Sequence, residues 1–377
     1  MKVIAVPNDY IKECAICGSG EIHSYPLRKE YAHNSIDCYV FEFSDSVCVD
    51  CGFAFSISRP NSVMLEKYYS NYLKSLSNVG SAEIDKRISI IQNFIKPPSS
   101  ILEIGGGYSG FCEKLEVLGY SVLNKDPSRH DVSAQVDEAG YDLVCSYYVG
   151  EHVLDINQWM SWMLDKLALG GKLLIEVPNF SKYPHESFNN EHINHFKLND
   201  LKLLFEQYGV KILDYSEENV GRYFGLWVIG ERELEVSSFA NRSLKQNNID
   251  ASLSLVEKTL AEKNRKQKNY KEISDEIEGL LNAGINVGIW PINEIASNIL
   301  RYATYDCNAK LNLFDIDPEK HGMNWCGLSN SILNPVNDKL ASCEKFYLCS
   351  PYYNQSIKEE LVVIGFADEQ IIDCCEI

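Results

Sequence analysis

The sequence Ile101-Leu-Glu-Ile-Gly-Gly-Gly-Tyr-Ser-Gly-Phe111 runs from β-favouring residues directly into three consecutive glycines. A helical pattern begins at once with Phe111. Glycines let the backbone approach a ligand closely, and the first turn of a helix offers N–H groups without partners inside the helix. The stretch therefore predicts a strand, a tight turn and a helix that together hold a nucleotide.

Acidic residues flank these glycines on both sides. Glu103 stands at the end of the predicted strand, and Asp126 ends a second apolar run about 20 positions beyond the glycines, where nucleotide-binding folds hold ribose hydroxyls. The spacing of Gly105, Gly107 and Gly110 fits either a dinucleotide or S-adenosylmethionine. Because the Glu103 carboxylate would repel a pyrophosphate, S-adenosylmethionine is the favoured ligand.

Further apolar runs alternate with helical patterns after the glycine turn. The runs over 141–146 and 171–177 are separated by an amphipathic stretch over 156–169. This alternation predicts a mostly parallel α/β sheet covered by helices on both faces, with ligands at the carboxyl ends of its strands. The residues expected to contact the cofactor are Glu103, Gly105, Gly107, Asp126, Tyr72 and Ser146.

Composition excludes several classes of protein. The chain has 377 residues and a net charge of −18, which argues against a general nucleic-acid binder. It contains no apolar run of about 18 residues that would span a membrane. The first residues do not form a secretory signal, so we expect a cytoplasmic protein whose 13 cysteines are thiols rather than disulfides.

Two Cys-x-x-Cys pairs, each followed by glycine, lie near the N-terminus. The pairs are Cys14 with Cys17 and Cys48 with Cys51, separated by 30 residues. Each pair forms a tight turn that aims two thiolates at one point, and two such turns complete a tetrahedral site for Zn²⁺. With four protein ligands the site is closed, so we expect a structural role. The alternative is two buried thiol pairs without a metal.

A tyrosine-rich segment follows the cysteines. Tyr68, Tyr69 and Tyr72 have helical spacing, and the segment ends at Pro97 and Pro98. One interpretation is an amphipathic helix that packs its rings on the next domain. The other is a lid over the cofactor, with the Tyr72 hydroxyl facing the ligand.

Three of the eight histidines fall in the loop that follows Pro178, namely His185, His192 and His195. Histidine is a natural general base near neutral pH, and the adjacent Glu191 carboxylate can support the imidazolium. Two alternatives remain open. The histidines cap the next helix or stabilise the loop, or a metal binds to His185, Glu186, His192 and His195.

The C-terminal third repeats the alternation of strands and helices after a long polar helical stretch. Asp315 and Asp317 follow a buried strand and are either ribose ligands or caps of the strand end. The predicted divisions are a zinc-binding module (1–60), a helical connector (61–98), a cofactor domain (99–232), a helical linker (233–283) and a second α/β domain (284–377).

Residues 100–230 resemble a class I S-adenosylmethionine-dependent methyltransferase. The whole layout resembles the three-domain sugar C-methyltransferases, which act on deoxysugar nucleotides. The motifs that carry the likeness are C-x-x-C twice, L-E-I-G-G-G, D-P-S at 126–128, E-H-V at 151–153, I-E-V-P at 175–178 and E-H-I-N-H-F at 191–196. The resemblance implies a Rossmann-like methyltransferase sheet, an N-terminal four-cysteine zinc module and a second, C-terminal Rossmann-like α/β domain.

The resemblance also implies a mechanism. Glu191 and His192 fall on the family's Tyr-x-Glu-His motif, but Asn189 takes the place of its tyrosine. The family removes a proton next to a ketone and methylates the resulting enolate at carbon. His192 would be the base, Glu191 its support, and Asn189 would polarise the substrate without exchanging a proton. The C-terminal domain would help to hold a nucleotide-sugar.

Two other functions fit the sequence. An O- or N-methyltransferase for a sugar or small metabolite would use His192 or His195 to take a proton from a hydroxyl or amine. A non-catalytic binding protein that keeps the fold would explain Asn189 and the lack of glycines in the turn over 290–294.

Overall fold

The structure is a computed structural model that describes residues 3–34, 36–72, 79–126, 140–188, 191–218, 225–233, 249–304 and 309–375. The chain divides into two compact units. One contains residues 6–29 and 42–259, and the other contains residues 1–5, 30–41 and 260–377. Within the described residues, no helix is both long and apolar enough to cross a membrane.

The first unit is built on a six-stranded sheet with the order β10-β9-β11-β12-β15-β14. Four strands are parallel, and β15 and β14 close the sheet in antiparallel fashion. The strands are β9 (Ser100–Ile104), β10 (Ser121–Lys125), β11 (Tyr141–Tyr147), β12 (Leu167–Pro178), β14 (Val210–Ser216) and β15 (Gly225–Arg232). The sequence-based prediction of a mostly parallel, Rossmann-like α/β sheet is confirmed.

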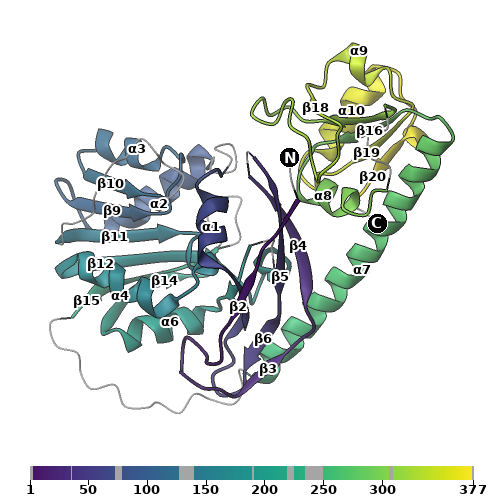
Figure 1. Cartoon of the computed structure of the whole chain (residues 1–377). Helices are drawn as coiled ribbons and strands as arrows, with labels where there is room; N and C mark the ends of the chain where they lie inside the picture. Colours follow the sequence, from purple (N-terminus) through teal and green to yellow (C-terminus); the bar gives the residue numbers. More distant parts are fainter. Residues whose placement is uncertain are drawn as a thin grey trace. The chain divides into compact units, whose positions relative to one another are not determined.

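Helices cover both faces of this sheet, as Figure 1 shows. Helices α2 (Ser81–Phe94) and α3 (Phe111–Val117) pack on one face, in a core that includes Ile91, Phe111 and Leu143. Helices α4 (Ile156–Lys166) and α6 (Leu198–Gln207) pack on the other, in a core that includes Met160, Val144 and Leu204. Alternate residues of β11 thus serve opposite cores, as the period of two along a strand requires.

The cysteine-rich segment belongs to the same unit. Its small antiparallel sheet has the order β13-β7-β6-β3, with β3 (Ile22–Ser24), β6 (Asp45–Cys48), β7 (Ala54–Ser56) and β13 (Asn194–His195). Strands β2 (Asn8–Tyr10) and β8 (Ser58–Pro60) pair beside it, and α1 (Ser62–Tyr69) follows. Because β13 comes from the loop after β12, its pairing with β7 fixes the histidine-containing loop against the cysteine-rich segment.

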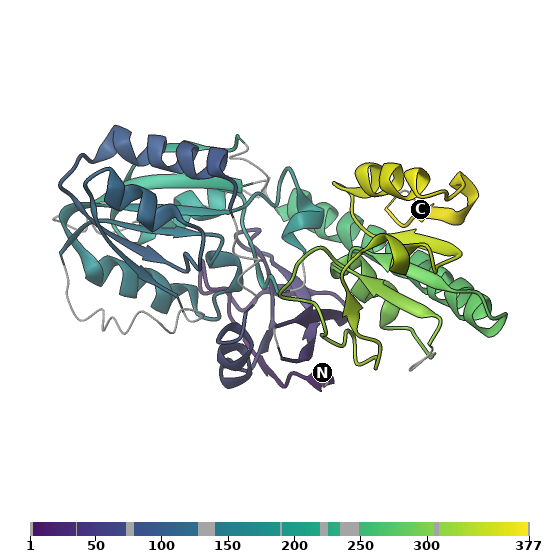
Figure 2. The same ribbon diagram turned by 90° about the horizontal axis from the view of Figure 1, so that it is seen from above.

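The second unit contains a five-stranded parallel sheet with the order β18-β17-β16-β19-β20. The strands are β16 (Val287–Trp290), β17 (Leu311–Phe314), β18 (Ile332–Leu333), β19 (Lys345–Leu348) and β20 (Ile371–Asp373). Helix α10 (Asn354–Val363) lies along one side of the strands in Figure 2 and contributes Ile357 and Leu361 to their core. Short helices α8 (Glu294–Leu300) and α9 (Asn337–Leu340) join the strands.

Residues from the N-terminal segment complete this second unit. Strand β1 (Val3–Ala5) pairs with β5 (Cys38–Phe43), and β5 lies beside β4 (Arg28–His33). Residues 30–41 are therefore grouped with the C-terminal third, whereas the sequence-based boundaries place them inside the module over 1–60. The single helix α7 (Ile249–Asn282) contributes to both units.

Candidate active site

The glycine turn lies at the carboxyl end of β9, and its close packing requires glycine. A Cβ at Gly106 would lie 2.0 Å from Oε2 of Glu103, and a Cβ at Gly105 would lie 2.3 Å from Val149. Gly105 also has a φ of 74°, which disfavours other residues. The backbone thus folds directly over the Glu103 carboxylate, and Gly110 leads into α3.

Asp126 ties this turn to the neighbouring strand. The N–H of Gly107 donates to Oδ2 of Asp126 over 2.9 Å, and the Asn124 side chain donates to the Gly107 carbonyl over 3.2 Å. The structure therefore brings Glu103, Gly105, Gly107 and Asp126 together at one edge of the sheet. The glycine backbone would let a ligand approach closely, and the half-exposed Asp126 carboxylate beside it could accept hydrogen bonds from the two hydroxyls of a ribose.

The Glu103 carboxyl is 1% exposed and accepts a hydrogen bond from the Cys112 thiol over 2.9 Å. Burial raises the pKa of Glu103 to about 7. A carboxyl with such a pKa changes its charge near neutral pH, so its surroundings decide whether it is ionised.

The other two predicted cofactor residues, Ser146 and Tyr72, do not lie together. Ser146 is buried in β11, and its hydroxyl donates to the Ile104 carbonyl over 3.4 Å, so it joins the two strands that carry the site. The Tyr72 ring instead contacts those of Tyr68 and Tyr69, with centroids 5.8 and 5.7 Å away. Tyr72 thus belongs to the aromatic cluster around Glu191.

A short turn after β11 carries part of the candidate catalytic cluster. This turn, η2 (Gly150–His152), is held by the segment that follows Glu191. The N–H of Ile193 donates to the Glu151 carbonyl over 2.8 Å, and the Asn194 side chain donates to the Gly150 carbonyl over 2.9 Å. These bonds fix the position of His192 relative to His152, whose ring centroids lie 4.7 Å apart.

Two phenols contact the Glu191 carboxylate. Tyr68 at the end of α1 donates to Oε1, and Tyr69 donates to Oε2 over 3.1 Å. Burial raises the pKa of Glu191 to about 7, although both phenol hydrogen bonds oppose the shift. The sequence predicts Tyr68 and Tyr69 on a helix that either packs its rings on the next domain or forms a lid over the cofactor, and it does not predict their contact with Glu191. Their helical spacing was visible, but only folding brings α1 to the loop after β12.

The predicted residue Asn189 lies outside the described residues, so its place relative to Glu191 and His192 is not described. His152 and Glu151 were missed as site residues, although E-H-V was recognised as a family motif. Their position directly after a strand that ends at the ligand edge is a signal that could have found them. His195 packs elsewhere, stacked on Phe188 and 3.4 Å from Asp45.

Of the open alternatives, a structural role describes His195, which is buried beside Asp45, whereas a helix cap does not. Helix α6 is capped by Lys197 and Asp200, because the Lys197 N–H donates to Oδ2 of Asp200 over 2.9 Å. His192 and His195 also belong to different clusters. Among the described residues, the histidine-containing group with metal-ligand spacing is Glu151, His152 and His192.

A buried ion-pair network lies near the same edge of the sheet. Arg87 of α2 contacts Glu83 over 2.7 Å and Glu176 of β12 over 3.1 Å. Tyr148, which has a φ of 56°, donates from its hydroxyl to Glu176 over 3.3 Å. A non-glycine residue in this left-handed conformation is held there by its surroundings, a feature that gathers at functional sites.

The four predicted zinc ligands converge. The sulfur of Cys14 lies 3.6 Å from that of Cys51, and the sulfur of Cys17 lies 3.5 Å from that of Cys48. In a tetrahedron with Zn–S bonds of about 2.3 Å, sulfur atoms lie about 3.8 Å apart. Gly18 and Gly52 close the two turns with positive φ. Their N–H groups donate to the backbone carbonyls of Cys14 and Cys48. The arrangement fits a four-thiolate zinc site.

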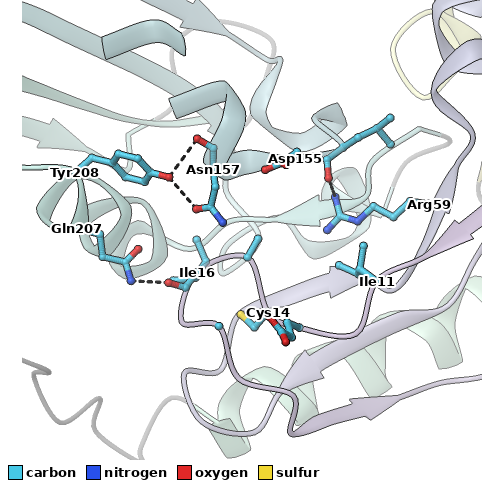
Figure 3. A pocket seen from close by; sticks show the side chains of 12 residues that line it. Ile11, Cys14, Ile16, Arg59, Asp155, Asn157, Gln207 and Tyr208 are labelled. Carbon is cyan, nitrogen blue, oxygen red and sulfur yellow. Dashed lines mark hydrogen bonds between the residues drawn. The ribbon is translucent and has the colours of Figure 1, made fainter. Parts of the chain in front are cut away.

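A cavity of about 530 Å³ lies beside the first of these turns and is drawn in Figure 3. Its walls include Cys14, Arg59, Asp155 and Tyr208, but none of the predicted catalytic residues. Arg59 is 2% exposed and donates to the carbonyls of Val153 and Leu154 over 3.1 and 3.0 Å. Arg59 thus holds the end of the turn that carries Glu151 and His152.

The family model of a methyltransferase domain matches residues 80–215, from the start of α2 to the end of β14. The chain contains a methyltransferase domain. The match covers the glycine turn, η2 and the loop with Glu191 and His192. No curated protein matches the sequence.

Several solved structures are similar to the central part of this chain. The 1,6-didemethyltoxoflavin-N1-methyltransferase of Burkholderia thailandensis is 14% identical, with a TM-score of 0.38, and the match covers 49% of this chain and 97% of that chain. An S-adenosylmethionine-dependent methyltransferase of Mesorhizobium loti is 14% identical, with a TM-score of 0.32 and coverages of 40% and 100%. A methyltransferase of Aquifex aeolicus is 12% identical, with a TM-score of 0.34 and coverages of 42% and 96%. Because their identities and TM-scores are low, the assignment of a methyltransferase domain rests on the family model.

Proposed function

We propose that the enzyme methylates a carbon atom next to the ketone of a nucleotide-linked deoxysugar. The observation that carries this proposal is the cluster around Glu191, whose carboxylate accepts hydrogen bonds from two phenols beside a pair of histidines. Such a cluster can remove a proton and return one to a carbonyl oxygen. The motifs shared with the sugar C-methyltransferases further support it.

The proposed step breaks the C–H bond next to the ketone. Its proton passes to the Glu191–His192 pair, and its electron pair forms the C=C bond of an enolate whose oxygen takes the negative charge. The sequence assigns the base to His192, and Glu191 is the second group able to take the proton. Tyr68 and Tyr69 supply the phenols that Asn189 lacks, so the loss of the motif's tyrosine does not argue against this chemistry.

The glycine turn is the proposed cofactor site. Gly105 and Gly107 would admit the cofactor to the backbone, Asp126 would accept from its ribose hydroxyls, and Glu103 would support the turn from below. When bound, S-adenosylmethionine supplies the methyl group, and its sulfur keeps the electron pair of the broken bond. Ser146 would support this site by joining β11 to β9, and Tyr72 would reach the cofactor only from the aromatic cluster around Glu191.

We also propose that Cys14, Cys17, Cys48 and Cys51 bind a structural Zn²⁺, because their sulfur separations suit tetrahedral coordination. A centre that needs reduced thiols suits the cytoplasm. The C-terminal unit is the proposed holder of the nucleotide. Asp315 is not assigned to the ribose, because its carboxylate accepts from the Ile292 N–H over 3.1 Å and pairs with Lys320 over 2.8 Å.

Hydrogen–deuterium exchange tests the proposal. The enzyme is incubated in deuterated water with a panel of nucleotide-linked ketodeoxysugars, with and without S-adenosylmethionine, and exchange next to the ketone is followed by NMR. We expect exchange without the cofactor and a C-methylated product with it. Glu191→Gln and His192→Ala should slow exchange by a factor on the order of 100 or more, and His185→Ala should not.

Calorimetric binding of S-adenosylmethionine and S-adenosylhomocysteine accompanies this assay. Methyl transfer to oxygen or nitrogen without any exchange would replace the proposal by heteroatom methylation. Cofactor binding with neither exchange nor transfer across the panel would contradict a nucleotide-linked ketosugar as substrate.

A further inference from the structure

The Glu151 carboxylate is unusual among the buried acids of this protein. It is 1% exposed, and neither of its oxygens has a hydrogen-bond partner among the described residues. Nε2 of the neighbouring His152 ring lies 3.8 Å from Oε1, which is too far for a hydrogen bond. Because a buried carboxylate without partners is costly, such a group either keeps its proton or binds a cation.

The His152 ring is oriented as in a metal ligand. Its Nδ1 lies 3.3 Å from the Glu191 carbonyl, which can only accept, so Nδ1 carries the proton. Nε2 then keeps its lone pair, and Nε2 is the nitrogen nearest to Glu151. Metal-binding histidines commonly donate their second N–H to a carbonyl in this way, which fixes the tautomer.

His192 completes the group. One ligand atom each from Glu151, His152 and His192 all lie within 4.8 Å of one another. In a tetrahedral site with bonds of about 2.1 Å, ligand atoms lie about 3.4 Å apart, so modest side-chain rotations bring the three to one metal. The bonds from Ile193 and Asn194 to η2 keep the two segments in this register.

We propose that Glu151, His152 and His192 bind a divalent transition-metal ion of the Zn²⁺ or Fe²⁺ class. Two histidines and one carboxylate are the ligand set that such ions use in catalytic sites, and this set leaves at least one position open for a substrate oxygen. The site is separate from the four cysteines, and its donors are harder than thiolates.

The role of the ion rests on the proposed function, although its binding does not. An ion at this position would draw electron density from the carbonyl oxygen of the substrate and stabilise the enolate oxygen as it forms. His192 would then be a ligand, and the proton from carbon would pass to Glu191. If the metal binds here, Glu191 rather than His192 is the group that takes the proton.

Calorimetric titration tests the site in the full chain without an affinity tag, with the cysteine centre already filled by one equivalent of zinc. Titration with Zn²⁺ should reveal a second equivalent. Glu151→Gln, His152→Ala and His192→Ala should each weaken it at least tenfold, while the first equivalent and cofactor binding stay unchanged. His185→Ala, in the same loop, should bind the second equivalent like the native protein.

A measurement on the native protein guards against variants that fail to fold. Cobalt(II) at the second site should give the visible absorption of a nitrogen- and oxygen-ligated ion, without the charge-transfer bands of thiolate ligands. The proposal is overturned if the native protein takes no second equivalent, or if the three variants bind it like the native protein. If the protein binds a second equivalent of Zn²⁺ but catalyses no hydrogen–deuterium exchange in the ketosugars, the metal site is supported and only the proposed function is contradicted.

Discussion

At the scale of single residues, Glu103 shows how burial controls charge at the glycine turn. Its carboxyl is covered by Gly106, hydrogen-bonded to Cys112 and 1% exposed. Because burial raises its pKa from 4.5 to about 7, the folded protein holds this proton at pH values where the unfolded chain has lost it.

The pKa of Glu103 predicts the sign of a pH effect on stability. The contribution of this carboxyl to the free energy of unfolding is fully present below about pH 4.5, and it is lost as the pH rises through 7. The free energy of unfolding of the native protein should therefore fall by about 2 to 3 kcal/mol between pH 5 and 8, relative to Glu103→Gln. Urea unfolding of both proteins across this range measures the difference. A constant difference, or one that grows in favour of the native protein, would contradict the assignment.

Glu191 illustrates a second residue-scale point. Its neighbours in sequence are His192 and a segment outside the described residues, but its described partners in space are Tyr68 and Tyr69, more than a hundred positions earlier. The acid–base character of this carboxyl therefore depends on groups that no local motif contains.

At the scale of elements, the turn between β9 and α3 has no space for a side chain at Gly106. Gly106→Ala would place a methyl group 2.0 Å from the Glu103 carboxylate, so the turn or the carboxylate must move. We expect a loss of about 1 to 3 kcal/mol in stability and at least tenfold weaker binding of S-adenosylhomocysteine. Thermal unfolding and calorimetry measure the two effects.

Gly279 is the matched control for this substitution. It lies inside α7, and an added Cβ would have no atom within 4 Å. Gly279→Ala should stabilise the helix by about 0.5 to 1 kcal/mol and leave cofactor binding unchanged. Equal behaviour of the two variants would mean that the turn adapts to a side chain.

The two cysteine turns make another prediction at this scale. Cys17→Ser removes one of four converging sulfur atoms, so the zinc content should fall by one equivalent and the Tm should drop by about 5 °C or more. Elemental analysis and calorimetry measure these changes. Cys375→Ser, outside the cluster, should keep the metal. Full stability of Cys17→Ser without zinc would favour the metal-free thiol pairs.

At the scale of the whole molecule, the two units have separate polar centres. In the C-terminal unit Asp315 links the turn after β16 to Lys320. Asp315→Asn should destabilise this unit by about 3 kcal/mol, because it leaves the Lys320 ammonium without its buried partner. Affinity for S-adenosylhomocysteine, whose proposed site lies in the other unit, should be unchanged. Unfolding traces and calorimetry test this, and a parallel loss of cofactor affinity would show that Asp315 acts on the cofactor site.

The fold was largely accessible from the sequence, and the site only in part. The sheet with the glycine turn followed from local apolar periodicity, and the convergence of the four cysteines followed from the spacing of two Cys-x-x-Cys pairs. The grouping of residues 30–41 with the C-terminal third, and of β13 with β7, depends on long-range strand pairing that leaves no local pattern.

The sequence by itself determined the strand–glycine–helix unit, the cofactor proposed for it and the candidate zinc ligands, because each depends on residues that are close in the chain or on a repeated Cys-x-x-Cys spacing. Only the tertiary structure decided that Tyr68 and Tyr69 meet Glu191, and that Glu151 and His152 face His192. These contacts arise where α1, η2 and the loop after β12 converge. Such convergence is set by how the sheet, its covering helices and the cysteine-rich segment pack together, and packing of distant elements has no signature in the order of residues.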